Sequence, residues 1–307
     1  MTGQPHVYII IVNYRHWRDT LECVQSLLAS SFPEFSIRVV DNASGNGSLE
    51  QLRAALSMPE PPELIRSEEP GKLVMNKPGR LTLVQHDVNA GFAAANNMVL
   101  KALLDKEGYV WLLNPDMTVE PGTMQQLVSF NEQDSNMTVT GAVIKSYHDK
   151  TKTLIRGGGL INTTKGTVKM NAGENNPPDY ISGASMFTKL AVFRLNGLLP
   201  EEYFLVWEET DWCYAARQKG VKMQVCKQAV CYDKISTSIG KGFAAQYYYT
   251  RNGLHFMARY FPDRVEQAVA AARWRLTGRI LTGRWAQAGG IRRGIADFLK
   301  KKYHAME

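Results

Sequence analysis

Long hydrophobic runs are missing from this sequence. About 44% of its 307 residues are apolar, but no stretch approaches the roughly 20 consecutive apolar residues that span a bilayer. The N-terminus runs directly into a short strand-like segment without a signal-peptide pattern, so we expect a cytosolic protein. The composition itself is that of a globular protein with one large core or two modest ones.

Cysteine is also scarce. The four cysteines show neither a paired CxxC spacing nor a disulfide framework, and they are Cys23, Cys213, Cys226 and Cys231. We therefore expect buried free thiols, and neither a zinc site nor disulfide bonds.

No glycine-rich phosphate-binding loop follows the first predicted strand. The first predicted strand, residues 7–12, is followed by Asn-Tyr-Arg-His and not by a Gly-x-Gly-x-x-Gly or Walker pattern. This argues against a nucleotide-binding oxidoreductase and against a P-loop protein.

Acidic residues are rare in one segment. Residues 264–302 hold ten Lys or Arg against two Asp or Glu, a local charge of +8, whereas the whole chain carries +7 and the remainder is therefore about −1. A basic excess confined to one segment points to an anionic surface. Nucleic acid is not expected as the partner, because no recognised nucleic-acid-binding module accompanies the charge.

The same segment is rich in large apolar residues. These residues interleave with arginines, and they are Trp274, Leu276, Ile280, Leu281 and Trp285. The pattern is typical of an amphipathic helix lying on an anionic membrane. A solvated basic helix packed on the body of the protein is the alternative. We expect the helical region to be interrupted by its glycines, which are Gly278, Gly283, Gly289 and Gly290.

Hydrophobic periodicity predicts an α/β protein with a mostly parallel sheet. Apolar runs predict strands at residues 7–12, 37–41, 81–84 and 109–113, and helical spacing appears between them, at 21–28, 48–56 and 92–104. Asp19 or Thr20 is placed to cap the first of these helices. The first strand is apolar throughout, so we expect it to be buried on both faces. The segment 57–80 holds five prolines and is interpreted as a surface insertion.

Polar residues follow each of the four predicted strands. They are Asn13 and Tyr14, Asp41 and Asn42, Asn89 and Gly91, and Asn114 and Asp116. Because ligands bind beyond the carboxyl ends of strands in open parallel sheets, these residues should share one rim. Asp41 could accept hydrogen bonds from a nucleotide base, and the helix behind Gly91 would suit a diphosphate. Asp116 could bind Mg²⁺ or Mn²⁺ together with phosphates. Turn or cap chemistry is the alternative for each position.

A second acidic group follows the aromatic run at residues 203–207. It consists of Glu208, Glu209 and Asp211. Carboxylates in partly desolvated surroundings are candidates for a raised pKa and for general-base catalysis. Acids that open a helix also complement its dipole, so a purely structural role remains the alternative.

Taken in order, these segments resemble the inverting family 2 glycosyltransferases of GT-A fold, in particular the rhamnosyltransferase-like branch. The resemblance covers roughly residues 7–260. It is carried by residues 7–14, 41–44 (Asp-Asn-Ala-Ser), 89–97 (Asn-Ala-Gly-Phe-Ala-Ala-Ala-Asn-Asn), 112–116 (Leu-Leu-Asn-Pro-Asp), 182–186 (Ser-Gly-Ala-Ser-Met), 207–211 (Trp-Glu-Glu-Thr-Asp) and 248–252 (Tyr-Tyr-Thr-Arg-Asn).

The resemblance implies a Rossmann-like GT-A domain at 1–262, followed by a basic amphipathic helical tail at 263–307. Within the domain, residues 1–120 would form the half that binds the nucleotide sugar, and residues 121–262 the half that binds the acceptor. The implied donor-binding residues are Asn13, Tyr14, Asp41, Asn42, Asn89, Gly91, Asn96, Asn114 and Asp116. The implied acceptor-binding residues are Ser182, Gly183, Trp207 and Asp211.

Two positions depart from the family pattern. Glu209 stands where an Asp is the usual base, which leaves Glu208 and Asp211 as competitors for the proton. Asp233 stands where relatives commonly place a His that faces the metal or the diphosphate. We expect Asp233 to be a metal ligand beside Asp116, with Lys234 or Lys241 offsetting its charge.

The implied activity is the transfer, with inversion, of rhamnose or a similar hexose from a dTDP- or UDP-sugar. Mg²⁺ or Mn²⁺ would be the cofactor, and a saccharide or lipid-linked saccharide of cell-surface polysaccharide synthesis would be the acceptor. The basic tail would hold the protein peripherally on the inner face of the cell membrane. A non-catalytic nucleotide-sugar-binding protein of the same fold is the alternative.

Overall fold

The computed structural model describes residues 3–57, 80–133, 136–170, 177–235, 242–302 and 305. The strands are β1 (Val7–Asn13), β2 (Phe35–Asn42), β3 (Leu81–His86), β4 (Tyr109–Leu113), β5 (Met117–Val119), β6 (Thr138–Ser146), β7 (Thr153–Arg156), β8 (Gly158–Asn162), β9 (Thr167–Met170), β10 (Tyr180–Ile181), β11 (Ser185–Lys189) and β12 (Lys222–Asp233). The α-helices are α1 (Trp17–Leu28), α2 (Ser48–Ala55), α3 (Gly91–Leu103), α4 (Thr123–Glu132), α5 (Leu190–Asn196), α6 (Glu208–Gln218), α7 (Phe243–Tyr260), α8 (Val265–Leu281) and α9 (Trp285–Leu299). The predicted insertion at 57–80 lies almost wholly outside the described residues.

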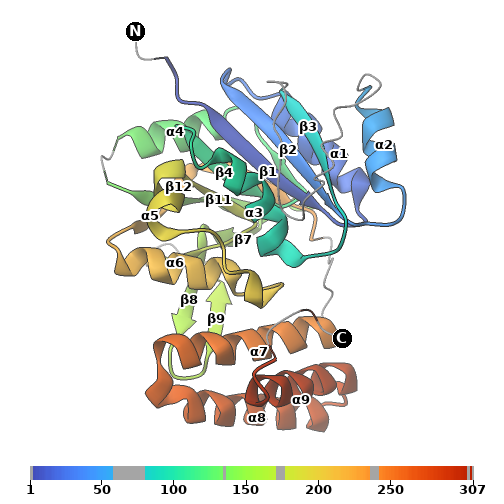
Figure 1. Cartoon of the computed structure of the whole chain (residues 1–307), viewed down its shortest axis with the longest axis vertical. Helices are drawn as coiled ribbons and strands as arrows, with labels where there is room; N and C mark the ends of the chain where they lie inside the picture. Colours follow the sequence, from blue (N-terminus) through green and yellow to red (C-terminus); the bar gives the residue numbers. More distant parts are fainter. Residues whose placement is uncertain are drawn as a thin grey trace.

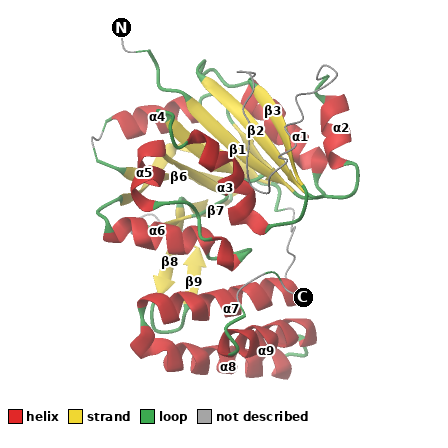
Figure 2. Cartoon of the chain, viewed as in Figure 1, coloured by secondary structure: helices red, strands yellow, loops and turns green. Residues whose placement is uncertain are grey.

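A mostly parallel sheet forms the centre of the molecule (Figures 1 and 2). Its strand order is β3-β2-β1-β4-β11-β6-β12-β5, with β7 beside β6. The first four strands run parallel, as predicted. β11 is antiparallel to both of its neighbours, β4 and β6, and β12 runs parallel to β6. A small antiparallel sheet, β10-β8-β9, lies beside it. The predicted α/β class is confirmed.

Both faces of the central sheet are covered, as expected for β1. Ile9 and Ile11 belong to one core cluster, which includes apolar residues of α1, α2 and α4. Ile10 belongs to the other, which includes residues of α3, α5 and α6. Successive residues of a strand point to opposite faces, so an uninterrupted apolar run buries both. All four cysteines are buried and free, which confirms the prediction for them.

The start of α1 differs from the prediction. The helix begins at Trp17, with His16 at the N-cap and no side-chain capping bond, so the predicted cap at Asp19 or Thr20 was wrong. The Thr20 hydroxyl instead donates to Asn13 Oδ1 at 2.7 Å and ties the helix to the end of β1. Asp19 lies in the first turn, where its charge complements the helix dipole.

The basic tail forms α8 and α9, which pack with α7 around an apolar cluster of their own. Gly283, with φ +67°, lies in the turn between the two helices, where the break was predicted. Gly278, Gly289 and Gly290 lie inside helices, so the predicted breaks there were wrong. A Cβ on Gly290 would lie 2.2 Å from the carbonyl oxygen of Phe243, so this glycine permits close helix packing. No helix in the described part of the chain is long and apolar enough to cross a membrane.

Candidate active site

The polar positions that follow the strands share one rim of the sheet, as predicted. In the parallel register Asn13 lies opposite Asp41, and Asn42 lies opposite His86. The backbone N–H of Asn114, just after β4, donates to the carbonyl of Ala184 at 3.0 Å. The rim therefore joins the ends of the first four strands to the loop before β11.

Asp41 is held in a buried hydrogen-bond network at this rim. Its Oδ1 accepts from Asn13 Nδ2 at 2.6 Å and from Ser44 Oγ at 2.5 Å. Its Oδ2 accepts from the backbone N–H of Ser44 at 3.1 Å. Asn13 and Asp41 are both buried, whereas Tyr14 is partly exposed. A donor base would have to exchange one of these bonds, so the roles of Asn13, Tyr14 and Asp41 in donor binding stay predictions.

Asn42 and Asn89 build the turn that opens α3. Asn42 Nδ2 donates to Asn89 Oδ1 at 2.9 Å, and Asn42 Oδ1 accepts from the N–H of Ala90 at 3.2 Å. The N–H of Gly91 donates to Asn89 Oδ1 at 3.2 Å. Further along α3, the buried Asn96 donates to the carbonyl of Phe92 at 2.8 Å. Donor contacts by Asn42, Asn89 and Asn96 stay predictions.

Gly91 lies against another segment of this chain, the loop that contains Phe204. The prediction for this position was a diphosphate at the start of the helix. Gly91 has φ +87°, and a Cβ there would lie 2.2 Å from the carbonyl oxygen of Phe204. That carbonyl accepts a hydrogen bond from the N–H of Phe92 at 2.9 Å. The start of α3 is therefore fixed against the loop before α6, and a contact between Gly91 and a diphosphate stays a prediction.

The loop before α6 has an unusual backbone. Phe204, Val206 and Trp207 have φ values of 63°, 67° and 86°, in the left-handed region that non-glycine residues rarely adopt. Such conformations persist only where the surrounding structure enforces them, and they cluster at functional sites. The Trp207 ring is buried in the cluster around α7. The geometry therefore gives no support to acceptor binding by this ring.

Two buried residues of α7, Arg251 and Asn252, hold this loop. Asn252 Nδ2 donates to three loop carbonyls, those of Tyr203 at 2.9 Å, Leu205 at 2.8 Å and Val206 at 2.7 Å. Arg251 Nη2 donates to the Tyr203 carbonyl at 2.9 Å. Residues 248–252 resemble a segment of the family, but no role was predicted for Asn252. Its only signal was an Asn beside an Arg in an otherwise aromatic helix.

Asp211 is the most enclosed of the three acids that open α6. It accepts from the hydroxyls of Tyr203 at 2.6 Å and Tyr260 at 2.9 Å, and Arg259 Nη1 lies 3.5 Å from Oδ2. Burial raises the pKa of Asp211, while the Tyr203 hydrogen bond and the Arg259 charge oppose that rise. Because both oxygens are engaged, the geometry makes Asp211 a link between α6 and α7 and favours Glu209 over it as the base.

Glu208 and Glu209 have contrasting surroundings. Glu208 is 3% exposed, and burial together with the charge of Glu209 raises its pKa to about 8. Within the described part of the chain its Oε2 has no hydrogen-bond partner. Burial also raises the pKa of Glu209, but nearby backbone N–H groups, including those of Trp207 and Gly183, oppose the rise. Glu209 is partly exposed. Of the two acids, Glu209 is therefore the one that solvent can reach.

The segment from Ser182 to Ala184 connects Glu209 with the end of β4. A Cβ on Gly183 would lie 3.6 Å from Cβ of Glu209, and the adjacent Ala184 carbonyl accepts from the N–H of Asn114. The buried Ser182 hydroxyl accepts from the N–H of Ala184 at 3.3 Å. Two groups predicted separately, the acids of α6 and the turn at Asn114, are thus brought together. Acceptor binding by Ser182 and Gly183 stays a prediction.

Asp116 and Asp233 come from neighbouring strands. In the antiparallel pairing of β5 with β12, Asp233 lies opposite Met117, and the N–H of Lys234 donates to the Asp116 carbonyl at 3.2 Å. Both aspartates are partly buried. Two carboxylates at a rim fit Mg²⁺ or Mn²⁺, which commonly use one or two protein carboxylates plus substrate phosphates. Among the described residues no three His, Cys, Asp or Glu side chains form a metal-binding group, so metal binding stays a prediction.

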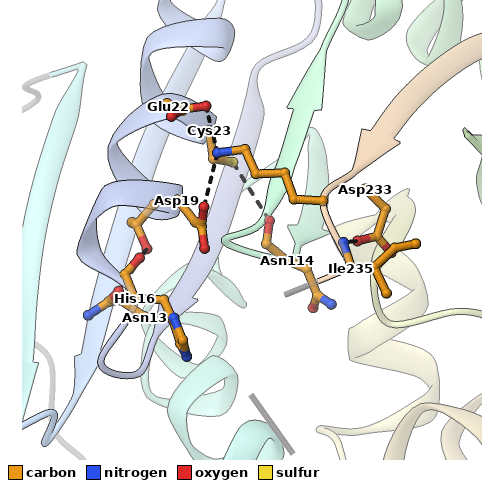
Figure 3. Close-up of polar contacts among 10 residues, drawn as sticks. Asn13, His16, Asp19, Glu22, Cys23, Asn114, Asp233 and Ile235 are labelled. Atoms are coloured by element: carbon orange, nitrogen blue, oxygen red, sulfur yellow. Dashed lines mark hydrogen bonds and ion pairs between the residues drawn. The ribbon is translucent and has the colours of Figure 1, made fainter. Parts of the chain in front are cut away.

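Lys234 pairs with acids other than Asp233, and Lys241, the other lysine predicted to offset that charge, lies outside the described residues. Lys234 Nζ lies 3.0 Å from Asp19 Oδ1 and 2.6 Å from Glu22 Oε2, both on α1. These two acids raise the pKa of Lys234 against the opposing effect of burial. Figure 3 shows Asp19 and Glu22 on α1, across from Asp233 at the end of its strand. The ion pairs therefore fasten α1 to the strand that carries Asp233.

Solved structures of glycosyltransferases share this fold. A mannosyltransferase from Pyrobaculum calidifontis, solved with GDP-Man and Mn²⁺, has a TM-score of 0.61 at 16% identity and covers 98% of this chain and 89% of its own. The S. aureus protein TarS (1–349), solved with UDP-GlcNAc, has a TM-score of 0.57 at 16% identity over 97% and 81% of the two chains. Identities this low show the fold alone, and they confirm the GT-A-like architecture.

A curated relative and a family description identify the chain more closely. The low-salt glycan biosynthesis hexosyltransferase Agl10 of Haloferax volcanii is 26% identical over 150 residues, which are 45% of this chain and 47% of that protein. The chain thus matches about half the length of this relative. Residues 8–193, the greater part of the chain, match the sequence model of glycosyl transferase family 2, and the protein belongs to that family.

Proposed function

We propose that the protein is an inverting glycosyltransferase that moves a hexose from a nucleoside diphosphate donor to an acceptor hydroxyl. One observation carries the proposal: the partly exposed Glu209 lies beside Gly183, and the adjacent Ala184 accepts a hydrogen bond from Asn114 at the strand rim. A direct displacement requires a base on one side of the rim and, on the other side, residues that can hold the phosphates and the metal.

Glu209 acts as the base in this proposal. Its carboxylate takes the proton of the acceptor hydroxyl while that oxygen bonds to the anomeric carbon. The bond between this carbon and the donor phosphate oxygen breaks, its electron pair leaves with the nucleoside diphosphate, and the configuration inverts. Glu208 stays protonated beneath Glu209, since burial raises its pKa to about 8, and so leaves the pair with one charge at neutral pH.

Asp116 and Asp233 would hold the metal, and Asn114 would lie close to the phosphates. A bound Mg²⁺ or Mn²⁺ would neutralise the negative charge that develops on the departing diphosphate. The chain's own contribution is to fix these carboxylates on paired strands, with Lys234 holding α1 against the end of β12. Oxygen ligands on a stiff sheet need little reorganisation when the donor binds.

The donor and acceptor are proposed from the sequence pattern and from relatives. The rhamnosyltransferase-like segments favour rhamnose or a similar hexose on dTDP or UDP. The Haloferax relative is named a hexosyltransferase of glycan biosynthesis, which supports a saccharide or lipid-linked saccharide acceptor in cell-surface polysaccharide synthesis. The P. calidifontis structure contains GDP-Man and Mn²⁺, so GDP-mannose belongs in any donor screen.

A donor screen followed by product analysis tests the proposal. Thermal shifts are measured with dTDP-rhamnose, UDP-hexoses and GDP-mannose, each with and without Mn²⁺. The donor that stabilises the protein is then incubated with saccharide acceptors, and the anomeric configuration of the product is read by NMR. Inverted product confirms the proposal, whereas retained configuration contradicts the displacement by Glu209. Tight donor binding with neither transfer nor donor hydrolysis would favour a non-catalytic nucleotide-sugar-binding protein.

A further inference from the structure

The second half of α8 and the start of α9 expose three large apolar side chains. Trp274 is 81% exposed, Leu281 80% and Trp285 68%, the three highest values for large apolar residues in the described part of the chain. Single exposed apolar residues are common on protein surfaces, but a cluster of this kind marks an interaction site. We call these three residues, with the exposed arginines Arg273 and Arg284, the tail tip.

Helix geometry gathers the apolar side chains of the tail tip. Trp274 and Leu281 are seven residues apart on α8 and so lie on one stripe, with Gly278 between them adding no side chain. Trp285 begins α9 directly after the turn at Gly283. Leu281 and Trp285 therefore flank the turn, and Trp274 lies about two helical turns before it on α8.

The charge around the tail tip has one sign. Residues 267–296 contain six arginines and no Asp or Glu. Arg275 is partly buried and is used within the fold, because it donates to the Thr250 hydroxyl at 3.2 Å and lies over the Tyr249 ring. Arg273 and Arg284 are exposed beside Trp274 and Trp285. Indole rings flanked by arginines fit the headgroup region of an anionic bilayer. A second copy of the chain fits worse, since its tip would bring the same positive charge.

The tail tip is fixed relative to the active site. α9 packs closely on α7, where a Cβ on Gly290 or Gly294 would meet backbone oxygens of α7 at 2.2 and 2.8 Å. The Tyr247 hydroxyl donates to Asp297 at 2.9 Å and joins the same two helices. α7 also carries Asn252, which holds the loop before the acids of α6. A surface that binds the tip therefore orients the site as well.

We propose that the tail tip inserts Trp274, Leu281 and Trp285 into the headgroup region of an anionic membrane, with Arg273 and Arg284 on lipid phosphates. This binding holds the rim of the sheet at a set orientation to the bilayer, where a lipid-linked acceptor is presented. The link to the acceptor rests on the proposed function, but the membrane contact itself does not.

Vesicle binding by the full chain tests the inference without any sugar donor. Co-sedimentation is measured with phosphatidylcholine vesicles and with vesicles that also contain about 30 mol% phosphatidylglycerol. The wild type should bind the anionic vesicles and shift its tryptophan emission to the blue. The triple variant Trp274→Ser/Leu281→Ser/Trp285→Ser should bind at least about tenfold more weakly. Arg273→Gln/Arg284→Gln should reduce the preference for anionic vesicles.

Leu195→Ser is the matched control, because Leu195 is an exposed apolar residue of α5 outside the tail. It should leave vesicle binding unchanged, and unchanged thermal melting shows that each variant is folded. Equal vesicle binding by wild type and triple variant overturns the inference, as does a wild type that binds neither vesicle. A wild type that self-associates through the tip, with a monomeric triple variant and no lipid binding, also overturns it. Because no donor is present, failure here leaves the proposed transfer reaction standing.

Discussion

At the scale of single residues, the neighbouring acids Glu208 and Glu209 differ because their surroundings differ. Glu208 is buried, and its Oε2 has no hydrogen-bond partner among the described residues, so burial and the charge of Glu209 raise its pKa to about 8 although backbone groups oppose the rise. Glu209 meets backbone N–H groups and solvent. We therefore expect Glu208 to hold the proton of the pair and Glu209 to act as the base.

The raised pKa of Glu208 makes stability depend on pH. The folded chain keeps this proton up to a pKa of about 8, whereas an unfolded chain loses it near the ordinary value of 4.5. The stability linked to this proton is therefore complete below pH 4.5 and is lost as pH rises toward 8, by at most about 1.4 kcal/mol per pH unit. Glu208→Gln has no such proton. In urea unfolding across this pH range, wild type should lose stability relative to Glu208→Gln; parallel profiles would refute the assignment.

Gly91 offers a second residue-scale test. Gly91→Ala should destabilise the fold, because a Cβ would lie 2.2 Å from the Phe204 carbonyl and the residue has positive φ. The matched control is Gly45→Ala, which shares the positive φ but has nothing within 4 Å. We expect a loss of about 1 kcal/mol for the control and about 1–3 kcal/mol more for Gly91→Ala, measured by urea unfolding. Equal losses would show that the contact with Phe204 is unimportant.

The order of residue types along the chain predicted which side chains lie at the rim. It did not predict which residues these side chains contact. The acids at 116, 208, 209 and 211 were found because each follows an apolar or aromatic run. The partner of Gly91 could not be found, since Phe204 lies more than a hundred residues away and contributes only a backbone oxygen. The contacts of Lys234 were predicted wrongly for the same reason, because α1 reaches it through the fold and not along the chain.

At the scale of elements, α7 determines the shape of the loop before α6. Asn252→Ala removes the amide whose two hydrogens are shared among three loop carbonyls and should cost about 1–3 kcal/mol in urea unfolding. Amide hydrogen exchange in residues 203–207 should rise at the same time, because the positive φ values lose their support. Asn196→Ala, which removes a single bond to the Trp212 carbonyl, is the control. Similar exchange in both variants would mean that Asn252 does not hold the loop.

Elements defined by local pattern were predicted well. β4 has the predicted bounds, because an unbroken apolar run is visible in a short window. The start of α1 was misplaced, since His16 supplies no capping bond. The antiparallel insertion of β11 between β4 and β6 depends on pairing between distant segments, and hydrophobic periodicity carries no information about it.

At the scale of the whole molecule, the proposed metal site joins the two halves of the chain. Asp116 precedes β5 and Asp233 ends β12, so a donor with Mn²⁺ bound to both should stabilise the complete fold. Asp116→Ala should lose the metal-dependent part of the thermal shift, by at least about 2 kcal/mol at saturating donor. Asp105 is exposed and forms an ion pair with its neighbour Lys106, so Asp105→Ala is the control. A full metal-dependent shift in Asp116→Ala would contradict this site.

The organisation of the tail was predictable in part. Charge and periodicity indicated basic helices, and the break at Gly283 was found. The packing of α9 on α7 was not, because a glycine that interrupts a helix and a glycine that admits a neighbouring helix look alike in a sequence. The division into a domain at 1–262 and a tail at 263–307 stays a prediction, although α7 and α9 share a core.

The central claim is that Glu209 removes the acceptor proton, and one comparison tests it most directly. Single-turnover transfer and calorimetric donor binding are measured for wild type, Glu209→Gln and Glu208→Gln with the donor found by screening. We predict that Glu209→Gln slows transfer by about 10²–10⁴-fold with donor affinity unchanged, while Glu208→Gln, which mimics an already protonated acid, keeps most of its rate. Near-normal transfer by Glu209→Gln would contradict the account.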